Sequence, residues 1–495
     1  MTTDEIASRN SRRNQQLGQQ AVRGASATIA GQLVRLVVLL ASTVILARLL
    51  SPADFGLVAI VMSLVALGEL FRDFGLSMAA ARTARLTHRQ MSNLFWINTV
   101  FGLLLAVAAY LLSGPIALLF SQPELKNIVI GLSFTFVFSG FSTQFRARIN
   151  QKLRFKRLAI VDTAPALAGL MGAIVYALLF TPDYWVLVVQ QLVVGVVGML
   201  LAVALSGWWP GWPSRRTSIR DVLSFGLGVF GSQAVAYVTK NVDNLSLGYF
   251  WGPSVLGVYG RAYQLLMLPL SQLAAPLTRV AVPVLTRVAN DRVRFNRFLL
   301  EGQLVGGVGL GIIYGIACGL AFPLVFLVFG ENWMGMVPIL QALAVGGVFR
   351  GLNQITFWIF LAKDKTGAQF RFFLVSQPII IAFMLGGMPW GALGVAIGHS
   401  IGYFFNWIIS LWWCGRVTDT EMGPLLRNGL KSISICVAPI TVIGILSSAF
   451  IQSPWLALTV GVLGMILYGS LAYLVFPFVR AVAQSGRMVA RKARR

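Results

Sequence analysis

The sequence predicts an all-α integral membrane protein with about fourteen transmembrane helices: two six-helix lobes in a parallel, pseudo-twofold repeat, followed by two C-terminal helices. The first indication is composition. Of the 495 residues, 57% are hydrophobic and 11% are charged, whereas soluble proteins carry about 25% charged residues. A membrane crossing needs about 20 apolar residues, and apolar stretches of that length recur from Thr28 almost to the C-terminus.

The apolar stretches are joined by turns of two alternating kinds, which is the second indication. One kind is short and almost free of cations, as in Ser51 to Asp54 and Trp251 to Pro253, and the other is basic, as in Arg82 to Arg89 and Arg146 to Arg157. We expect helices near residues 27–50, 53–80, 91–113, 124–145, 158–180, 184–206, 221–249, 253–286, 298–328, 336–361, 370–388, 391–414, 431–451 and 455–477.

The distribution of positive charge predicts the topology. The chain has 40 Lys and Arg against 16 Asp and Glu, a formal net charge of +24. Thirty-two of these cations lie in the basic turns or near the two termini, and only Lys126 lies in a cation-poor turn. Because Lys and Arg collect in cytoplasmic loops, we expect both termini in the cytoplasm and an even number of crossings. The same rule explains the net charge without a nucleic-acid partner.

An internal repeat is the third indication. The segment Gly31 to Leu57 matches Ser232 to Val258 at an offset of 201 residues, and Pro115 to Phe120 matches Pro323 to Phe329 at an offset of 208 to 209. Two matches in the same order indicate two halves of six helices each. Because six is even, both halves enter the membrane in the same direction, which is the parallel-repeat architecture of transporters with a site between the lobes.

These observations divide the chain into six parts. We expect a basic cytoplasmic leader (1–26), an N-lobe (27–206), a cytoplasmic linker (207–220), a C-lobe (221–416), two added helices (417–477) and a basic cytoplasmic tail (478–495).

Charged side chains inside the apolar stretches are the candidates for a functional site. A charge at the bilayer centre costs about 2.5 to 3.5 kcal/mol on insertion scales, so each one needs a partner or water. The deep cations are Arg35, Arg72, Lys240, Arg261 and Arg350, and the acids that could act in ion pairs or in ion coupling are Glu69, Asp73 and Asp243.

Several of these charges also have a purely structural interpretation. Glu69 and Arg72, like Lys240 and Asp243, are three residues apart in the sequence. At that spacing the two members of a pair share one helix face and can neutralise each other.

The remaining deep cations differ in depth. Arg35 and Arg261 can reach an interface by snorkelling, whereas Arg350 has no acid nearby in its own helix and lies too deep to do so. Because the deep cations outnumber the deep acids, a water-filled space between the lobes would have a positive potential. Such a space suits a diphosphate or an acidic sugar, since guanidinium groups bind phosphate oxygens in pairs.

Uncharged polar residues on the same helices could bind sugar hydroxyls, or could equally join helices by hydrogen bonds. They are Gln32, Gln233, Tyr237, Asn241, Asn353 and Gln354.

The sequence contains no pattern that indicates metal, cofactor or catalytic chemistry. Cys318, Cys414 and Cys436 lie in or beside apolar stretches without the spacing of metal ligands, and His88 and His399 are interpreted as structural or exposed. No phosphate-cradling Gly-rich motif of ATPases is present. We therefore expect neither an enzyme nor a cofactor, and energy from an ion gradient, from the substrate gradient or from consumption of the product.

Several segments together resemble a known family. They are Leu49 to Leu57, Arg146 to Arg157, Gly257 to Leu265, Leu268 to Leu270 and Ala275 to Val280. They resemble the polysaccharide transporter family that includes the Wzx flippases and colanic-acid-type exporters, in the multidrug, oligosaccharidyl-lipid and polysaccharide exporter superfamily. The resemblance implies a two-lobed helical fold in the bacterial cytoplasmic membrane. It also implies that a polyprenyl-diphosphate-linked oligosaccharide is flipped or exported by alternating access, for lipopolysaccharide, exopolysaccharide or capsule biosynthesis.

The resemblance implies partners as well as a substrate. The expected ligand is an oligosaccharide linked to undecaprenyl diphosphate, membrane lipids surround the helices, and polysaccharide polymerase and chain-length machinery are candidate protein partners.

Three alternatives remain open. A cation-coupled drug exporter of the same superfamily would favour carboxylates in its cavity, against the cationic balance found here. A polytopic enzyme of polysaccharide assembly would need a sizeable outside loop for its catalytic residues, whereas each outside loop expected here spans only a few residues. A membrane scaffold would show no transport defect when deep arginines are changed singly.

Overall fold

The computed structural model describes residues 31–73, 87–152, 154–214 and 220–493, and it contains no strand in these ranges. The expected leader, most of the basic turn from Arg82 to Arg89, and residues 215–219 of the expected linker lie outside the described residues. The chain folds as two compact units, residues 1–241 and 242–495.

Thirteen helices in the described ranges are long and apolar enough to cross a membrane. One of them, from Tyr237 to Arg287, has 51 residues, far more than the roughly 20 that one crossing needs. It belongs to α8 (Arg220–Arg287), which is interrupted at Gly252 by a backbone with φ 79° and ψ 177°. Because this break coincides with the expected turn from Trp251 to Pro253, the two arms of α8 correspond to the seventh and eighth expected helices.

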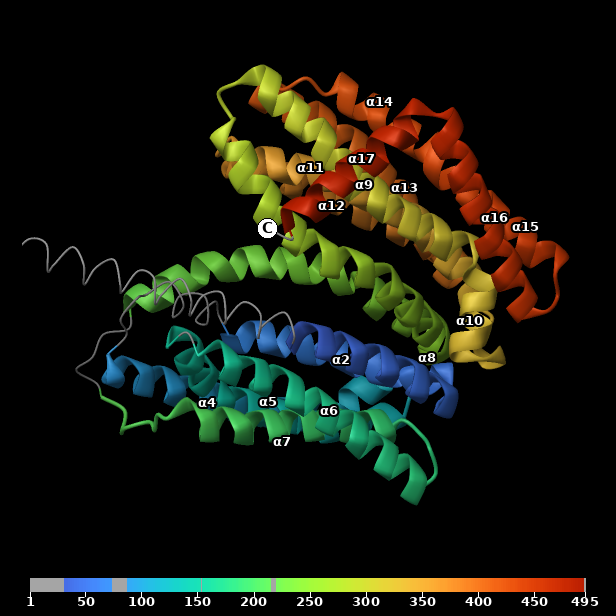
Figure 1. The fold of residues 1–495 in the computed structure, drawn as a ribbon. Helices are drawn as coiled ribbons and strands as arrows, with labels where there is room; N and C mark the ends of the chain where they lie inside the picture. The colour runs from blue at the N-terminus through green and yellow to red at the C-terminus, as the bar shows by residue number, and fades with distance from the viewer. Residues whose placement is uncertain (1–30, 74–86, 153, 215–219, 494–495) are drawn as a thin grey trace, which may run out of the picture. The chain divides into compact units, whose positions relative to one another are not determined.

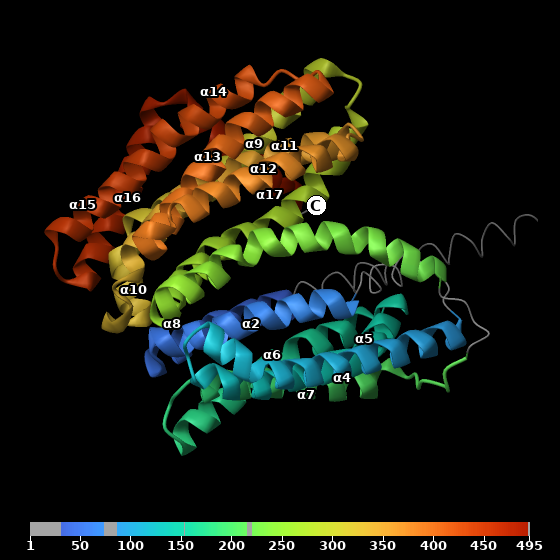
Figure 2. The same cartoon turned by 180° about the vertical axis from the view of Figure 1, so that it is seen from behind.

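The first unit is a bundle of membrane-spanning helices (Figures 1 and 2). It comprises the helix Gly31–Leu49, α2 (Pro52–Asp73), α4 (His88–Leu119), α5 (Glu124–Gln151), α6 (Phe155–Leu179), α7 (Trp185–Ser206) and the start of α8. Within it, α5 packs against α4, α7, α2 and α6.

The first part of α8 belongs to the first unit by its side-chain contacts. The rings of Phe230 and Phe71 lie 5.5 Å apart, and the Tyr237 hydroxyl donates a hydrogen bond to the Ser63 carbonyl at 2.7 Å. The boundary between the units therefore lies inside α8, rather than at the linker that we expected to end at residue 220.

The second unit begins within α8 and continues to the C-terminus. It contains α9 (Arg292–Gly319), α10 (Ala321–Phe329), η1 (Glu331–Trp333), α11 (Met336–Ala362), α12 (Thr366–Gly386), η2 (Met388–Trp390), α13 (Gly391–Thr418), α14 (Gly423–Lys431), the π-helical η3 (Ser432–Val437), α15 (Ala438–Phe450), α16 (Pro454–Val475) and α17 (Pro477–Ala493). Here α11 packs against α9 and α13, while α12 covers α13 and α15 packs on α16 and α9.

The order of helices supports the repeat. The proline near the end of the first match begins α2 at Pro52, and its counterpart Pro253 begins the second arm of α8. The second match falls at the end of α4 in one unit and in α10 in the other. The following α5, α6 and α7 then correspond in order to α11, α12 and α13.

Two expected helix boundaries are wrong at this second match. The helix expected to end at residue 113 continues through Pro115 to Leu119, whereas the single helix expected at 298–328 ends at Gly319 and restarts at Ala321. The apolar run continues through both places, so hydrophobicity alone does not mark the break.

Capping residues begin the helices that follow basic turns. Thr87 and Gln90 form a reciprocal capping box at the start of α4, and the Asp291 side chain accepts from the Arg294 amide at the start of α9. Each satisfies backbone N–H groups that the first helical turn leaves free.

The basic segment 146–157 joins α5 to α6. Arg146 pairs with Asp162. Desolvation, followed by repulsion from Arg148, Arg154 and Arg157, lowers the pKa of Lys152. This concentration of positive charge outside the apolar helices is typical of a cytoplasmic loop.

Much of the C-terminal segment is helix rather than a plain tail. In α17, the side chains of Phe478, Val479 and Val482 pack on a cluster formed by Leu304 and Cys436 with their neighbours. The segment expected as a basic tail from residue 478 is therefore docked on the second unit at its beginning.

Candidate functional site

The first unit contains a polar cluster built around Arg72, near the end of α2. The Arg72 side chain is 7% exposed. Its Nε and Nη2 atoms both donate to one carboxylate oxygen of Glu69, at 2.9 and 2.7 Å. Its Nη1 atom donates to Asn98 of α4 at 3.2 Å and to Thr143 of α5 at 2.9 Å. The pairing expected between Glu69 and Arg72 is confirmed.

Neighbouring helices complete this cluster. Ser139 of α5 donates to the second carboxylate oxygen of Glu69 at 2.5 Å. The backbones of α4 and α5 come close beside Asn98, because a Cβ atom on Gly140 would lie 2.7 Å from the Asn98 carbonyl oxygen. With its charges paired and its donors bonded to oxygen atoms, the Arg72 cluster is suited to joining α2, α4 and α5.

The second unit contains an arginine in different surroundings. Arg350 lies near the middle of α11 and is partly buried. Its Nη1 atom approaches the Tyr263 hydroxyl of α8 at 3.4 Å and Nε2 of His399 on α13 at 3.3 Å. The Tyr403 ring, one turn further along α13, lies 4.5 Å from the guanidinium carbon. These neighbours offer lone pairs and an aromatic face without a formal negative charge.

No ion pair to Arg350 occurs among the residues that the structure describes. Nor do its Nε and Nη2 atoms have an acceptor within this described part of the chain. On a guanidinium group these two atoms form one edge, whose N–H groups can bind two oxygens of a carboxylate or phosphate. Chemically, the site can therefore bind an anion at that edge.

A buried acid lies on the same helix as Tyr263. Asp243 is 2% exposed; its carboxylate accepts from the Tyr259 hydroxyl and from the Asn244 amide, each at 2.8 Å. Lys240 is exposed, and the described ion pairs do not include one between it and Asp243. The interpretation of Lys240 and Asp243 as a neutralising pair is therefore wrong. Asp243 bonds instead to Tyr259, which lies beyond the break at Gly252.

Other predicted site residues in and before α8 belong to neither the Arg72 cluster nor the Arg350 cluster. Arg35 is exposed, and Arg261 bonds to Gln264. Asn241 donates to the backbone carbonyl of Tyr237 at 3.0 Å. Gln233 is partly buried, Gln32 is exposed, and the side chain of Asp73 lies outside the described residues.

The two polar residues after Arg350 in α11 have structural partners. Asn353 accepts from Thr356 at 3.0 Å and also from Ser410 on α13. Gln354 approaches the Thr278 hydroxyl of α8 at 3.4 Å. These contacts join helices, as polar residues commonly do inside a membrane.

Sequence reasoning missed three members of the Arg350 cluster, namely Tyr263, His399 and Tyr403. The sequence predicts that His399 is structural or exposed, and the structure shows it 1% exposed and bonded to Arg350. The available signal was its spacing of four from Tyr403, which places both side chains on one face of a helix.

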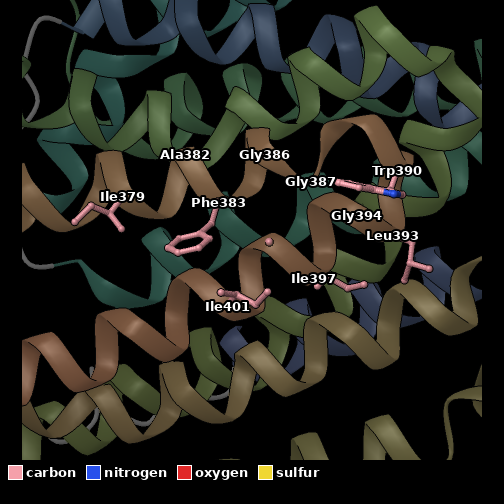
Figure 3. A pocket seen from close by; sticks show the side chains of 11 residues that line it. Ile379, Ala382, Phe383, Gly386, Gly387, Trp390, Leu393, Gly394, Ile397 and Ile401 are labelled. Carbon is pink, nitrogen blue, oxygen red and sulfur yellow. The ribbon is translucent and has the colours of Figure 1, made fainter.

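An apolar groove lies between α12 and α13 (Figure 3). Its volume is about 670 Å³, and its lining includes Phe383, Ile397 and Ile401. At about 100° per residue, His399 and Tyr403 point about 200° away from Ile397 and Ile401 on α13. This groove is therefore a hydrocarbon-lined surface and not the anion site.

A family model described as "polysaccharide biosynthesis protein" matches residues 45–338. Three individual relatives also share most of their length with this chain. The lipopolysaccharide biosynthesis protein WzxC of Escherichia coli is 27% identical over 405 residues, covering 80% of each chain. The teichuronic acid biosynthesis protein TuaB of Bacillus subtilis is 26% identical, covering 86% of this chain and 88% of its own. The succinoglycan biosynthesis transport protein ExoT of Rhizobium meliloti is 24% identical, covering 74% and 75%.

Solved structures show the same fold. The lipid II flippase MurJ in an inward closed conformation superposes with a TM-score of 0.70 at 16% identity, covering 91% of this chain and 99% of its own. An inward-facing multidrug resistance transporter of the MATE family superposes with a TM-score of 0.56 at 17% identity, covering 79% and 95%. At these identities the likeness concerns the two-lobed helical fold alone. With a family model that spans more than half of its length, this multi-pass membrane protein belongs to the polysaccharide biosynthesis protein family.

Proposed function

We propose that this protein flips a polyprenyl-diphosphate-linked oligosaccharide from the cytoplasmic to the outer leaflet of the bacterial cytoplasmic membrane, with Arg350 binding the diphosphate. The observation that carries the proposal is a partly buried arginine, in the middle of a membrane-spanning helix, without a carboxylate partner in the described part of the chain. Relatives named for lipopolysaccharide, teichuronic acid and succinoglycan biosynthesis support a glycan substrate.

The energetics favour an anionic ligand at Arg350. An uncompensated charge at the bilayer centre costs about 2.5 to 3.5 kcal/mol on insertion scales. Tyr263, His399 and Tyr403 relieve part of that cost, and the buried Asp243 carboxylate attracts the guanidinium charge without forming an ion pair with it. A diphosphate would supply negative charge in direct contact with the guanidinium group, together with several acceptor oxygens.

The lipid part of the substrate requires apolar surroundings. Undecaprenyl diphosphate, with its long hydrocarbon chain, is the carrier that we infer.

We also infer that the basic turns and both termini face the cytoplasm, where the substrate is loaded. Of the candidate acids for ion coupling, Glu69 is paired with Arg72, whereas Asp243 has no ion-pair partner in the described residues and stays the candidate.

A deletion strain tests the flippase assignment. We expect loss of the gene to cause accumulation of the lipid-linked oligosaccharide on the cytoplasmic face, as measured by accessibility to an added glycosidase in inside-out and right-side-out vesicles. Wild-type protein should reverse the accumulation and Arg350→Ala should not. Arg292→Ala is the matched control, because Arg292 forms an exposed pair with Glu421 and such pairs contribute about 0 to 1 kcal/mol.

The other outcomes identify the alternatives. An unchanged distribution in the deletion strain would contradict a flippase and favour a scaffold. A normal glycan with increased drug sensitivity would favour a drug exporter. Accumulation that Arg350→Ala relieves as well as wild type does would retain the flippase and exclude Arg350 as the diphosphate ligand.

A further inference from the structure

The two deep arginines have the same arrangement of donors but different ligands. In both, Nη1 is directed at neutral side chains from neighbouring helices, which are Asn98 and Thr143 for Arg72, and Tyr263 and His399 for Arg350. The Nε and Nη2 edge of Arg72 is filled by the Glu69 carboxylate. The same edge of Arg350 has no acceptor among the described residues. Glu69 thus shows within this chain that an oxygen of an anion can occupy that edge.

The contact with Arg350 fixes the protonation of His399. A guanidinium group only donates hydrogen bonds, so Nε2 of His399 must accept and the ring must be neutral with its proton on Nδ1. Nδ1 is buried and has no partner in the described part of the chain. The ring is instead held by packing, since its centre lies 4.6 Å from that of Tyr403 and 5.8 Å from that of Tyr263.

The backbone around His399 limits the ring further. A Cβ atom on Gly346 of α11 would lie 2.9 Å from Nδ1 of His399 and 2.6 Å from Oγ of Ser400. Ser400 also donates to the Ala342 carbonyl at 2.5 Å, which ties α13 to α11 at this level. The small residue lets α11 and α13 approach closely enough for His399 to reach Arg350.

We propose that neutral His399 is a positioning residue: its Nε2 lone pair holds Nη1 of Arg350 so that the Nε and Nη2 edge is presented to two oxygens of a diphosphate. This inference rests on the proposed function, in which Arg350 binds the substrate diphosphate. A monophosphate can occupy the Nε and Nη2 edge of Arg350. A diphosphate can occupy the same edge, and its second phosphate is attracted by the guanidinium charge as well. The site should therefore distinguish diphosphate from monophosphate only when the guanidinium is held in place.

Binding to the purified full chain in lipid nanodiscs tests the proposal, with farnesyl diphosphate and farnesyl monophosphate as probes. For His399→Leu we expect the affinity ratio of diphosphate to monophosphate to fall about ten-fold, the effect of one hydrogen bond to a charged group. His399→Gln should retain most of the ratio, because its amide oxygen can accept near the position of Nε2. Gly346→Ala should lower the ratio by displacing the ring while leaving the imidazole in place.

Two controls separate positioning from folding and from the proposed function itself. Asn406→Ala removes another buried polar group of α13 and should leave the ratio unchanged. A purely structural role for His399 would lower the melting temperature of His399→Leu without moving the ratio, and that result would overturn the inference. If Arg350→Ala loses the diphosphate preference while His399→Leu keeps it, positioning fails and the proposed function stands. If Arg350→Ala also keeps the preference, the assignment of Arg350 fails.

Discussion

Arg72 of the first unit and Arg350 of the second both lie deep among their helices, and their charges are compensated in opposite ways. In the first unit, Arg72 is paired with Glu69 on its own helix and also donates to Asn98 and Thr143. In the second, Arg350 is surrounded by a histidine and tyrosines, and no ion pair to it occurs in the described residues. The repeat therefore preserves an architecture while its charged residues diverge, with one unit suited to structure and the other to binding an anion.

Arg350→Gln should give the largest effect on transport. Removing two charge-assisted hydrogen bonds to a bound diphosphate costs about 3 kcal/mol or more, so we expect flipping to fall at least about 100-fold. The protein should still fold, because Arg350 forms no ion pair with a carboxylate in the described part of the chain. Transport per amount of membrane-inserted protein is the measurement, and transport within two-fold of wild type would contradict the role of Arg350.

Arg72→Gln should mainly affect stability. It leaves Glu69 in a partly buried site without its cation, which costs about 1 to 3 kcal/mol, and we expect a lower melting temperature in detergent. The double variant Glu69→Gln with Arg72→Gln should regain much of the loss, because neither charge is then unpaired. If the double variant is the less stable of the two, the structural interpretation of the pair is wrong.

Tyr259→Phe tests the buried acid of the second unit. The substitution removes one of the two hydrogen bonds that Asp243 accepts, and we expect a destabilisation of about 1.5 kcal/mol. Tyr259→Phe combined with Asp243→Asn should be less destabilised than the sum of the single variants. Additive losses in thermal unfolding would show that the two side chains act independently.

Lys240→Ala should give the smallest change in this series. Lys240 is exposed. Two unit charges 4 Å apart in bulk water attract each other by about 1 kcal/mol, which sets the scale for what an exposed lysine can add to diphosphate binding. We expect diphosphate affinity to fall by about five-fold or less, with the difference decreasing as salt is added. A loss as large as that of Arg350→Gln would move the diphosphate site to the first unit.

Much of the fold could be predicted from hydrophobicity, charge and the repeat. Apolar runs located the membrane helices, and the turn at Gly252 separated the two arms of α8. The break at Leu320 could not be predicted, because it interrupts an apolar run of uniform character. Side-chain packing along α8 also sets the unit boundary, and packing of this kind is not visible in composition.

The candidate site was predictable only where its partners are close in sequence. Glu69 and Arg72 share a helix face, so spacing was sufficient. Arg350 was singled out because its own helix lacks an acid, but its neighbours Tyr263 and His399 lie 87 and 49 residues away. Lys240 and Asp243 have the spacing of a pair, yet Asp243 bonds to Tyr259 once the chain turns back at Gly252. Local pattern cannot detect such long-range competition.

The most direct test compares the two arginines in one transport measurement. Proteoliposomes would contain an NBD-labelled polyprenyl-diphosphate monosaccharide, and loss of fluorescence to external dithionite would report its movement between leaflets. We expect the charge-free pair, Glu69→Gln with Arg72→Gln, to retain most of the wild-type rate and Arg350→Gln to show only the protein-free rate. Equal losses in the two variants, or a loss confined to the Glu69 and Arg72 variant, would contradict the assignment of the unpaired arginine as the substrate-binding group.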